Sequence, residues 1–308
     1  MTLEDVRQQF LSVQLTKHEY IRSMYELHAR ILEYPDFIRD SDISSITISS
    51  DGVVLQTKVA GVQLQLNSVD ERLTPLEIIN FGNYEKNETE MFLRLAQGID
   101  VVFDIGANIG WYSLNTAKRY GSAVEIHAFE PIPATYSQFV RNIKLNGAES
   151  VHPNNFGFSD ESSAKTFFYY PQGSGNASTA NLSGRDDVEE IVCNVRMMDD
   201  YARETGVLPD LIKCDVEGAE LFVFKGGAET IAKALPIVFT EMLRKWAKQF
   251  GYSPNDIIDW FAVLGYGCFT VQGSRLARFG RMDDETTETN FFFLHDEKHA
   301  SQITEFAG

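Results

Sequence analysis

The chain of 308 residues is long enough to bury one large core, and its 44% hydrophobic residues are typical of a folded protein. Its 44 acidic and 27 basic residues give a formal charge of −17, which disfavours nucleic acid and anionic membranes as partners and favours a small or neutral one. The three cysteines form no CxxC pair, no apolar run predicts a membrane span, and the acidic N-terminus is not a secretory signal, so we expect a cytoplasmic protein.

The N-terminal part of the chain predicts a small α+β appendage. Apolar residues recur at helical spacing over residues 3–33, and Pro35 is expected to end this helix or helix pair. Residues 46–59 predict a β-hairpin, and the alternation over residues 62–66 predicts one further strand. We assign residues 1–95 to an appendage for acceptor binding or for formation of a homodimer through its helices.

Residues 96–308 predict one α/β domain, because short apolar strands alternate with helices there. A hairpin over residues 167–170 and 190–195 is expected to surround the Gly-rich loop 172–184, which is either a lid or a plain loop. Seven strands predict a Rossmann-like parallel sheet. The predicted strands are residues 101–105, 124–129, 150–158, 211–214, 237–240, 267–271 and 291–294, and the predicted helices are residues 111–120, 134–146, 221–234 and 255–264.

A glycine-rich turn follows the first of these strands. The segment Phe103–Gly110 (FDIGANIG) ends an apolar strand and opens a helix, which is the context that a ligand-binding turn requires. Gly106 and Gly110 permit backbone conformations that a Cβ forbids, and Asn108 tolerates a left-handed one. Asp104 is predicted to meet the ammonium group of a methionine moiety, directly or through water. Since ligands of open α/β sheets bind at the carboxyl ends of the strands, the turn predicts a cofactor site.

An acid at the end of the next strand narrows the choice of cofactor. Glu130 is placed to accept both hydroxyls of a ribose. A dinucleotide is one alternative, but the chain lacks G-x-G-x-x-G, and an anion at Asp104 opposes a pyrophosphate while it suits the cationic amino end of S-adenosylmethionine. We therefore predict S-adenosylmethionine, with a purely structural turn as the remaining alternative. The other predicted cofactor contacts are Ala107, Tyr112, Pro131, Phe156, Gly157 and Asp215.

Charged residues cluster after the strand over residues 211–214. Lys213, Asp215 and Glu217 are two apart, so they share one face while the chain stays extended. Such charges are costly at an apolar strand end unless they serve a site or pair with one another, and a buried ion-pair network is the alternative for Lys213 and Glu217. Asp215 lies next to the expected position of the transferable methyl group. Glu241 ends the neighbouring strand and can reach the same crevice.

Together these motifs resemble the FkbM family of methyltransferases. The resemblance rests on DIGANIG at 104–110, FEPIPATYSQFVRNIKLN at 129–146 and LIKCDVEGAE at 211–220, and it extends over roughly residues 80–295. It implies a class I methyltransferase fold with S-adenosylmethionine as the methyl donor. It also implies O-methylation, often of sugars in glycans, glycolipids or natural products.

The expected reaction is methyl transfer to a sugar hydroxyl, with Lys213, Asp215, Glu217 and Glu241 at the catalytic centre. Such a hydroxyl has a high pKa, and its proton must leave as the C–O bond forms. Asp215 and Glu241 are predicted to act on it as a base or, alternatively, as ligands of Mg²⁺. The alternatives are N- or C-methylation of a small metabolite and a catalytically silent module that binds the cofactor.

Overall fold

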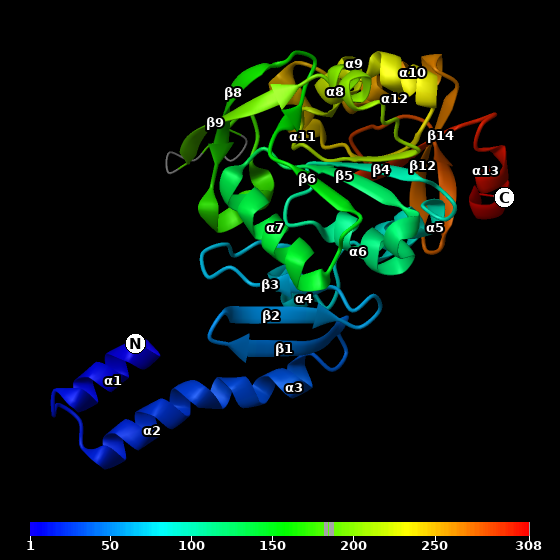
Figure 1. Cartoon of the computed structure of the whole chain (residues 1–308). Helices are drawn as coiled ribbons and strands as arrows, with labels where there is room; N and C mark the ends of the chain where they lie inside the picture. Colours follow the sequence, from blue (N-terminus) through cyan, green and yellow to red (C-terminus); the bar gives the residue numbers. More distant parts are fainter. Residues whose placement is uncertain (182–183, 185–187, 308) are drawn as a thin grey trace.

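An eight-stranded mixed sheet forms the centre of the computed structural model, which describes residues 1–181, 184 and 188–307 (Figure 1). Its strands lie in the order β13 (Arg275–Phe279), β12 (Tyr266–Gln272), β14 (Asn290–His295), β11 (Ile237–Glu241), β10 (Leu211–Cys214), β4 (Val101–Ile105), β5 (Glu125–Phe129) and β6 (Val151–Asn154). From β11 to β6 neighbouring strands are parallel, whereas β14 is antiparallel to both β11 and β12. The parallel strands therefore bring their carboxyl ends to one edge, where such sheets bind ligands.

Helices cover both faces of this sheet, because its apolar strands must be shielded from water on both sides. Successive residues of a strand point to opposite faces, so Val102 of β4 packs into one core and Phe103 into the other. The first face carries α5 (Lys86–Leu95), α6 (Trp111–Tyr120) and α7 (Pro133–Asn146), and the second carries α8 (Met198–Thr205), α9 (Glu220–Gly226), α10 (Ala228–Ala234) and α12 (Pro254–Val263) (Figure 1).

All seven predicted strands contribute to this sheet, the third only with its first part, which confirms the α/β class. The sequence pattern does not indicate β13, the eighth strand. The third predicted strand, over residues 150–158, is divided, because β7 (Gly157–Phe158) leaves the main sheet and pairs with β9 (Glu189–Arg196). β9 also pairs antiparallel with β8 (Ser163–Tyr169), which confirms the predicted hairpin. Of the loop 172–184, residues 182 and 183 lie outside the described residues.

The helix predicted over residues 221–234 consists of α9 and α10, which meet at Gly227. A Cβ on Gly227 would lie 2.8 Å from the sulfur of Met198, so a larger residue at this junction would require the Met198 side chain to shift. By contrast, α6 has its predicted bounds, since Gly110 and Gly121 flank it with φ values of +96° and +59°. Beyond the N-terminal segment, five α-helices of the described residues are not indicated by the sequence pattern: α4 (Thr74–Phe81), α5, α8, α11 (Arg244–Ala247) and α13 (Ala300–Ala307).

The N-terminal segment contains the predicted helix pair and hairpin. The helix end predicted at Pro35 is wrong, because Pro35 lies in the first turn of a further short helix, where its missing N–H has no helical acceptor to lose. The helical elements are α1 (Leu3–Leu11), α2 (Lys17–His28), η1 (Ala29–Glu33) and α3 (Tyr34–Phe37), and an antiparallel sheet of β1 (Ile43–Ser49), β2 (Gly52–Thr57) and β3 (Gln63–Gln65) follows. Helices α1 and α2 stand apart from the main sheet (Figure 1).

The boundary predicted between residues 95 and 96 does not coincide with a break in the core. Val62, Leu73 and Phe92 pack in the same core as β4. Strand β3 is also tied to α7, because the N–H of Gln65 donates to Asn142 Oδ1 at 3.0 Å. Residues 62–95 are thus part of the sheet domain, and the predicted role of the appendage stays a prediction. Within the described residues, the structure has no helix with the length and apolar character that a membrane crossing needs.

Candidate active site

A cavity of about 420 Å³ opens where β4, β5 and β10 end. Its volume lies within the range of small-molecule sites, roughly 300–1,000 Å³. The turn after β4 forms one wall and the residues that follow β5 form another. The loop after β10 and the end of β11 complete it. The cavity therefore lies at the sheet edge that the sequence predicts for a ligand.

The glycine-rich turn has the backbone that its residues suggest. Gly106, Asn108 and Gly110 have φ values of +71°, +48° and +96°. The N–H groups of Gly106 and Ala107 both donate to the carbonyl oxygen of Phe129 at 3.0 Å, which ties the turn to the end of β5. A Cβ on Gly106 would lie 1.9 Å from the carbonyl oxygen of Asp215. Gly106 is thus required by the close approach of two loops as well as by its φ.

Glu130 lies in the cavity wall directly after β5 and is only 6% exposed. Its two carboxylate oxygens accept the N–H groups of Asn108 at 3.0 Å and Ile132 at 2.9 Å. Each oxygen has a second lone pair available for a ligand hydroxyl. Burial raises the pKa of Glu130 to about 7, although the two backbone N–H groups oppose this change.

The raised pKa of Glu130 predicts pH-dependent binding of a ribose. Because the ionised carboxylate is the better acceptor, S-adenosylhomocysteine is expected to bind about tenfold more weakly at pH 6 than at pH 8. Isothermal titration calorimetry at both pH values measures this difference. The Glu130→Gln variant should bind more weakly and lose the pH dependence. A variant that retains the full pH dependence would assign it to another group.

Asp104 lies beneath the glycine turn and not in the cavity wall. Its carboxylate is 1% exposed, does not line the cavity, and accepts the N–H and the hydroxyl of Ser113 at 3.1 and 2.5 Å. Its other oxygen lies 3.7 Å from Lys213 Nζ. Direct contact with a ligand's ammonium group does not fit this burial, because Asp104 is engaged beneath the turn.

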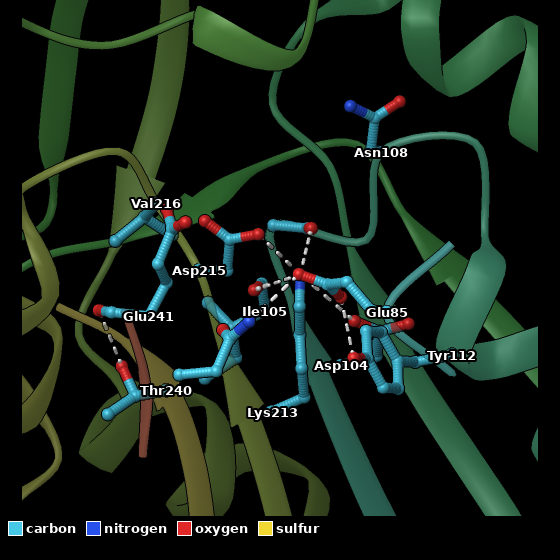
Figure 2. Close-up of polar contacts among 12 residues, drawn as sticks. Glu85, Asp104, Ile105, Asn108, Tyr112, Lys213, Asp215, Val216, Thr240 and Glu241 are labelled. Atoms are coloured by element: carbon cyan, nitrogen blue, oxygen red, sulfur yellow. Dashed lines mark hydrogen bonds and ion pairs between the residues drawn. The ribbon is translucent and has the colours of Figure 1, made fainter. Parts of the chain in front are cut away.

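Lys213 connects the turn to the end of β10. Its ammonium group donates to the carbonyl oxygen of Gly106 at 2.6 Å and lies 3.5 Å from Asp215 Oδ2 (Figure 2). Burial alone would lower the pKa of Lys213, but the carboxylates of Asp215 and Asp104 raise it above its ordinary value. Lys213 is therefore a permanent cation of the site. Its pairing with Asp104 and Asp215 is the buried ion-pair network that the sequence left open as an alternative.

Three carboxylates lie together on the opposite wall. One oxygen from each of Asp215, Glu217 and Glu241 lies within 4.8 Å of the others. Figure 2 shows the carboxylates of Asp215 and Glu241 side by side. One buried oxygen of Asp215 and one of Glu217 have no hydrogen-bond partner among the described residues. Burial, together with Asp215 and Glu217, raises the pKa of Glu241 to about 10, so in this state Glu241 carries a proton at neutral pH.

The remaining predicted contacts divide into two groups. Gly110 and Phe156 do not line the cavity, and Phe156 packs on Phe129 with ring centres 5.4 Å apart. Phe158, which the sequence analysis does not single out, lines it instead. The predicted cofactor contacts in the cavity wall are Gly106, Ala107, Asn108, Tyr112, Glu130, Pro131, Gly157 and Asp215, together with the predicted catalytic residues Lys213, Glu217 and Glu241.

Several lining residues come from segments that carry no recognisable signal in the sequence. Tyr84 and Glu85 precede α5, a helix that the pattern does not indicate, and Arg72 precedes α4. Glu220 is 2% exposed and orders the loop after β10, because one of its oxygens accepts the N–H groups of Val216 and Gly218, both at 3.0 Å. Only the folded chain shows these contributions.

The fold and the site together define a class I methyltransferase fold. The antiparallel strand β14 lies between β11 and β12 in a sheet whose other central strands are parallel, a glycine turn follows the central strand β4, and an acid after the next strand bonds to that turn. Residues 104–268 match the methyltransferase FkbM domain. The chain belongs to the FkbM methyltransferase family, as its motifs indicate.

Three curated relatives show how far this similarity extends. Methyltransferase 1 of Beauveria bassiana is 32% identical over 143 residues, which cover 41% of this chain and 57% of the relative. Hexuronic acid methyltransferase AglP of Haloferax volcanii is 28% identical over 175 residues, 56% of this chain and 66% of the relative. The 31-O-demethyl-FK506 methyltransferase FkbM of Streptomyces tacrolimicus is 30% identical over 156 residues, 41% of this chain and 59% of the relative. The chain thus spans less than two thirds of the length of each.

Proposed function

We propose that the protein is an S-adenosylmethionine-dependent O-methyltransferase that acts on a sugar hydroxyl. The observation that carries this proposal is Glu130, a buried acid that borders the cavity and is bonded to the glycine turn. A ribose fits two carboxylate oxygens that each keep a free lone pair, and the acidic cavity suits a cationic donor. The names of two relatives, a hexuronic acid methyltransferase and a methyltransferase for 31-O-demethyl-FK506, support a hydroxyl acceptor.

In this proposal the donor is held along the sheet edge. Glu130 binds the ribose hydroxyls, while Gly157 and Phe158 border the adenine. When bound, S-adenosylmethionine supplies a methyl group that is already activated by its positive sulfur. The protein must therefore mainly align the acceptor oxygen, exclude water and remove one proton.

Asp215 is the proposed proton acceptor. It lies at the end of β10 beside the expected position of the methyl group, and Lys213 Nζ balances its charge from 3.5 Å. As the acceptor hydroxyl is methylated, its proton passes to the Asp215 carboxylate. Glu241, which is protonated at neutral pH in the absence of a cation, donates a hydrogen bond that orients the acceptor.

A second version places a divalent cation among Asp215, Glu217 and Glu241. The specific observation in its favour is the 4.8 Å grouping of one oxygen from each residue. Hard oxygen ligands suit Mg²⁺, which would lower the pKa of a coordinated hydroxyl.

Chelation separates these two versions. Because the proposed proton acceptor needs no metal, dialysis against EDTA is expected to leave methyl transfer within about twofold of its starting rate. If the rate of methyl transfer falls by more than about tenfold and added Mg²⁺ restores it, the acceptor hydroxyl is activated by a metal ion and not by a base alone. Transfer is measured with methyl-labelled donor, and S-adenosylhomocysteine binding serves as the control for an intact cofactor site.

The acceptor side of the cavity has an aromatic wall with two cations. Trp246 lines it, and Lys245 Nζ lies 3.9 Å from the centre of one of its rings. Arg72 contributes a guanidinium group from the segment before α4. We propose that these three groups face a sugar that carries a carboxylate. By contrast, Trp260 packs on Phe261 and does not line the cavity.

Two measurements test the proposed function. Calorimetry should show that the protein binds S-adenosylmethionine and S-adenosylhomocysteine, and absence of binding to both would overturn the proposal. Incubation of labelled donor with a panel of hexosides and hexuronides should label the oxygen of an acidic sugar. Labelling of only amines or carbon nucleophiles would favour the alternative of N- or C-methylation, and binding without any transfer would favour a silent cofactor-binding module.

A further inference from the structure

The inner part of the cavity contains more carboxylates than its buried cation, Lys213, can balance. Lys213 is shared between Asp104 at 3.7 Å and Asp215 at 3.5 Å. Glu85 lines the same cavity, and no lysine, arginine or histidine of the described residues forms an ion pair with it. Buried charges are normally paired, so a ligand that brings positive charge to Glu85 would relieve this imbalance.

Two hydrogen bonds hold the Glu85 carboxylate in place, although no cation of the described residues pairs with it. The hydroxyl of Tyr112 donates to its Oε2 at 2.7 Å, and the side-chain amide of Asn290 donates to its Oε1 at 3.0 Å. Figure 2 shows Glu85 beside Tyr112, close to the end of Lys213. Both donors are neutral, and each oxygen has a further lone pair. Glu85 also has a φ of +40°, a left-handed conformation that is uncommon and costly for a residue with a side chain.

The position of Glu85 along the sheet edge indicates which part of a ligand it meets. Glu130 follows β5, on one side of β4. Asn290, which holds Glu85, begins β14 on the other side of β4, beyond β10 and β11, and is the register partner of Glu241. An elongated ligand with its adenosine at Glu130 therefore directs its opposite end towards Glu85.

We propose that Glu85, rather than Asp104, binds the ammonium group of the donor's methionine moiety. This inference rests on the proposed function and adds to it a contact from a segment outside the glycine turn. The ammonium group would donate hydrogen bonds to the unused lone pairs of the Glu85 carboxylate, while Asp104 stays bonded to Ser113 and paired with Lys213 beneath the turn. Glu85 is thus a binding residue that selects a donor with an intact amino acid end.

Two ligands that differ only in this end provide the test. S-adenosylhomocysteine has the α-amino group, whereas 5′-methylthioadenosine has the same adenosine and sulfur without the amino acid. In Glu85→Gln, calorimetry is expected to show about ten- to hundredfold weaker binding of S-adenosylhomocysteine, which is the range of a hydrogen bond to a charged group. Binding of 5′-methylthioadenosine should stay within about twofold, because it does not reach Glu85.

The matched control is Glu90→Gln in α5, the helix that follows Glu85, where Glu90 forms a surface ion pair with Arg119 at 3.1 Å. It should change neither affinity. An unchanged affinity of Glu85→Gln for S-adenosylhomocysteine would overturn the inference, and so would an equal loss for both ligands. If the wild-type protein binds both ligands with equal affinity, the role of Glu85 is overturned while the proposed function stands. If it binds neither, the proposed function fails as well.

Discussion

Replacing Asp215 with asparagine is expected to lower kcat for methyl transfer by about 10²–10⁴-fold, the usual range for loss of a general base. Asparagine keeps the size of the side chain but cannot take a proton from the acceptor hydroxyl. Lys213 keeps Asp104 at 3.7 Å as its partner, so the buried cation is not left alone. We therefore expect S-adenosylhomocysteine to bind within about threefold of the wild-type affinity, which separates a defect in catalysis from a defect in binding.

The control for this variant is Asp51→Asn in the exposed turn between β1 and β2, which should leave both kcat and binding unchanged. Labelled donor and a hexuronide acceptor give the rate, and calorimetry gives the affinity. If Asp215→Asn transfers methyl groups at more than about a third of the wild-type rate, Asp215 is not the proton acceptor. Glu241 would then be the next candidate proton acceptor, and Glu241→Gln would test it in the same way.

Replacing Gly106 with alanine is expected to weaken donor binding by at least about 100-fold, or about 2.7 kcal/mol. The new Cβ would lie 1.9 Å from the carbonyl oxygen of Asp215, a backbone atom that cannot rotate away. The turn and the loop after β10 would have to separate, and Lys213 would lose its 2.6 Å bond to the Gly106 carbonyl oxygen. The left-handed φ of +71° adds a further cost of about 1–2 kcal/mol to the fold.

Gly98 offers a matched control for the effect of φ. Its φ is +79°, close to that of Gly106, but a Cβ there would meet no atom within 4 Å. Gly98→Ala should therefore lower only the free energy of unfolding, by about 1–2 kcal/mol, and leave donor binding intact. Chemical unfolding and calorimetry on both variants provide the comparison. Equal effects of the two substitutions would show that backbone conformation, and not the contact with Asp215, requires the glycine.

Much of the fold could be predicted because its signals are local. The strand β4 and the helix α6 have their predicted bounds, since an apolar run, a glycine turn and a glycine after the helix are all written within about 20 residues. The left-handed φ of Asn108 follows from the same local chemistry. By contrast, no local signal indicates the break at Gly227, whose backbone leaves the helical conformation with φ −116° and ψ +19°.

The sequence by itself determined the alternation of seven strands with four helices, the glycine turn and the acid after the next strand, since each depends on residues close together in the chain. Only the tertiary structure decided which charges meet. Lys213 and Asp104 are register partners in adjacent parallel strands, and Glu85 reaches the same cavity from the segment before α5. The reason is that strand order and register arise from packing across the whole sheet, which a local pattern does not encode. The electrostatics of the site is therefore a property of the folded chain.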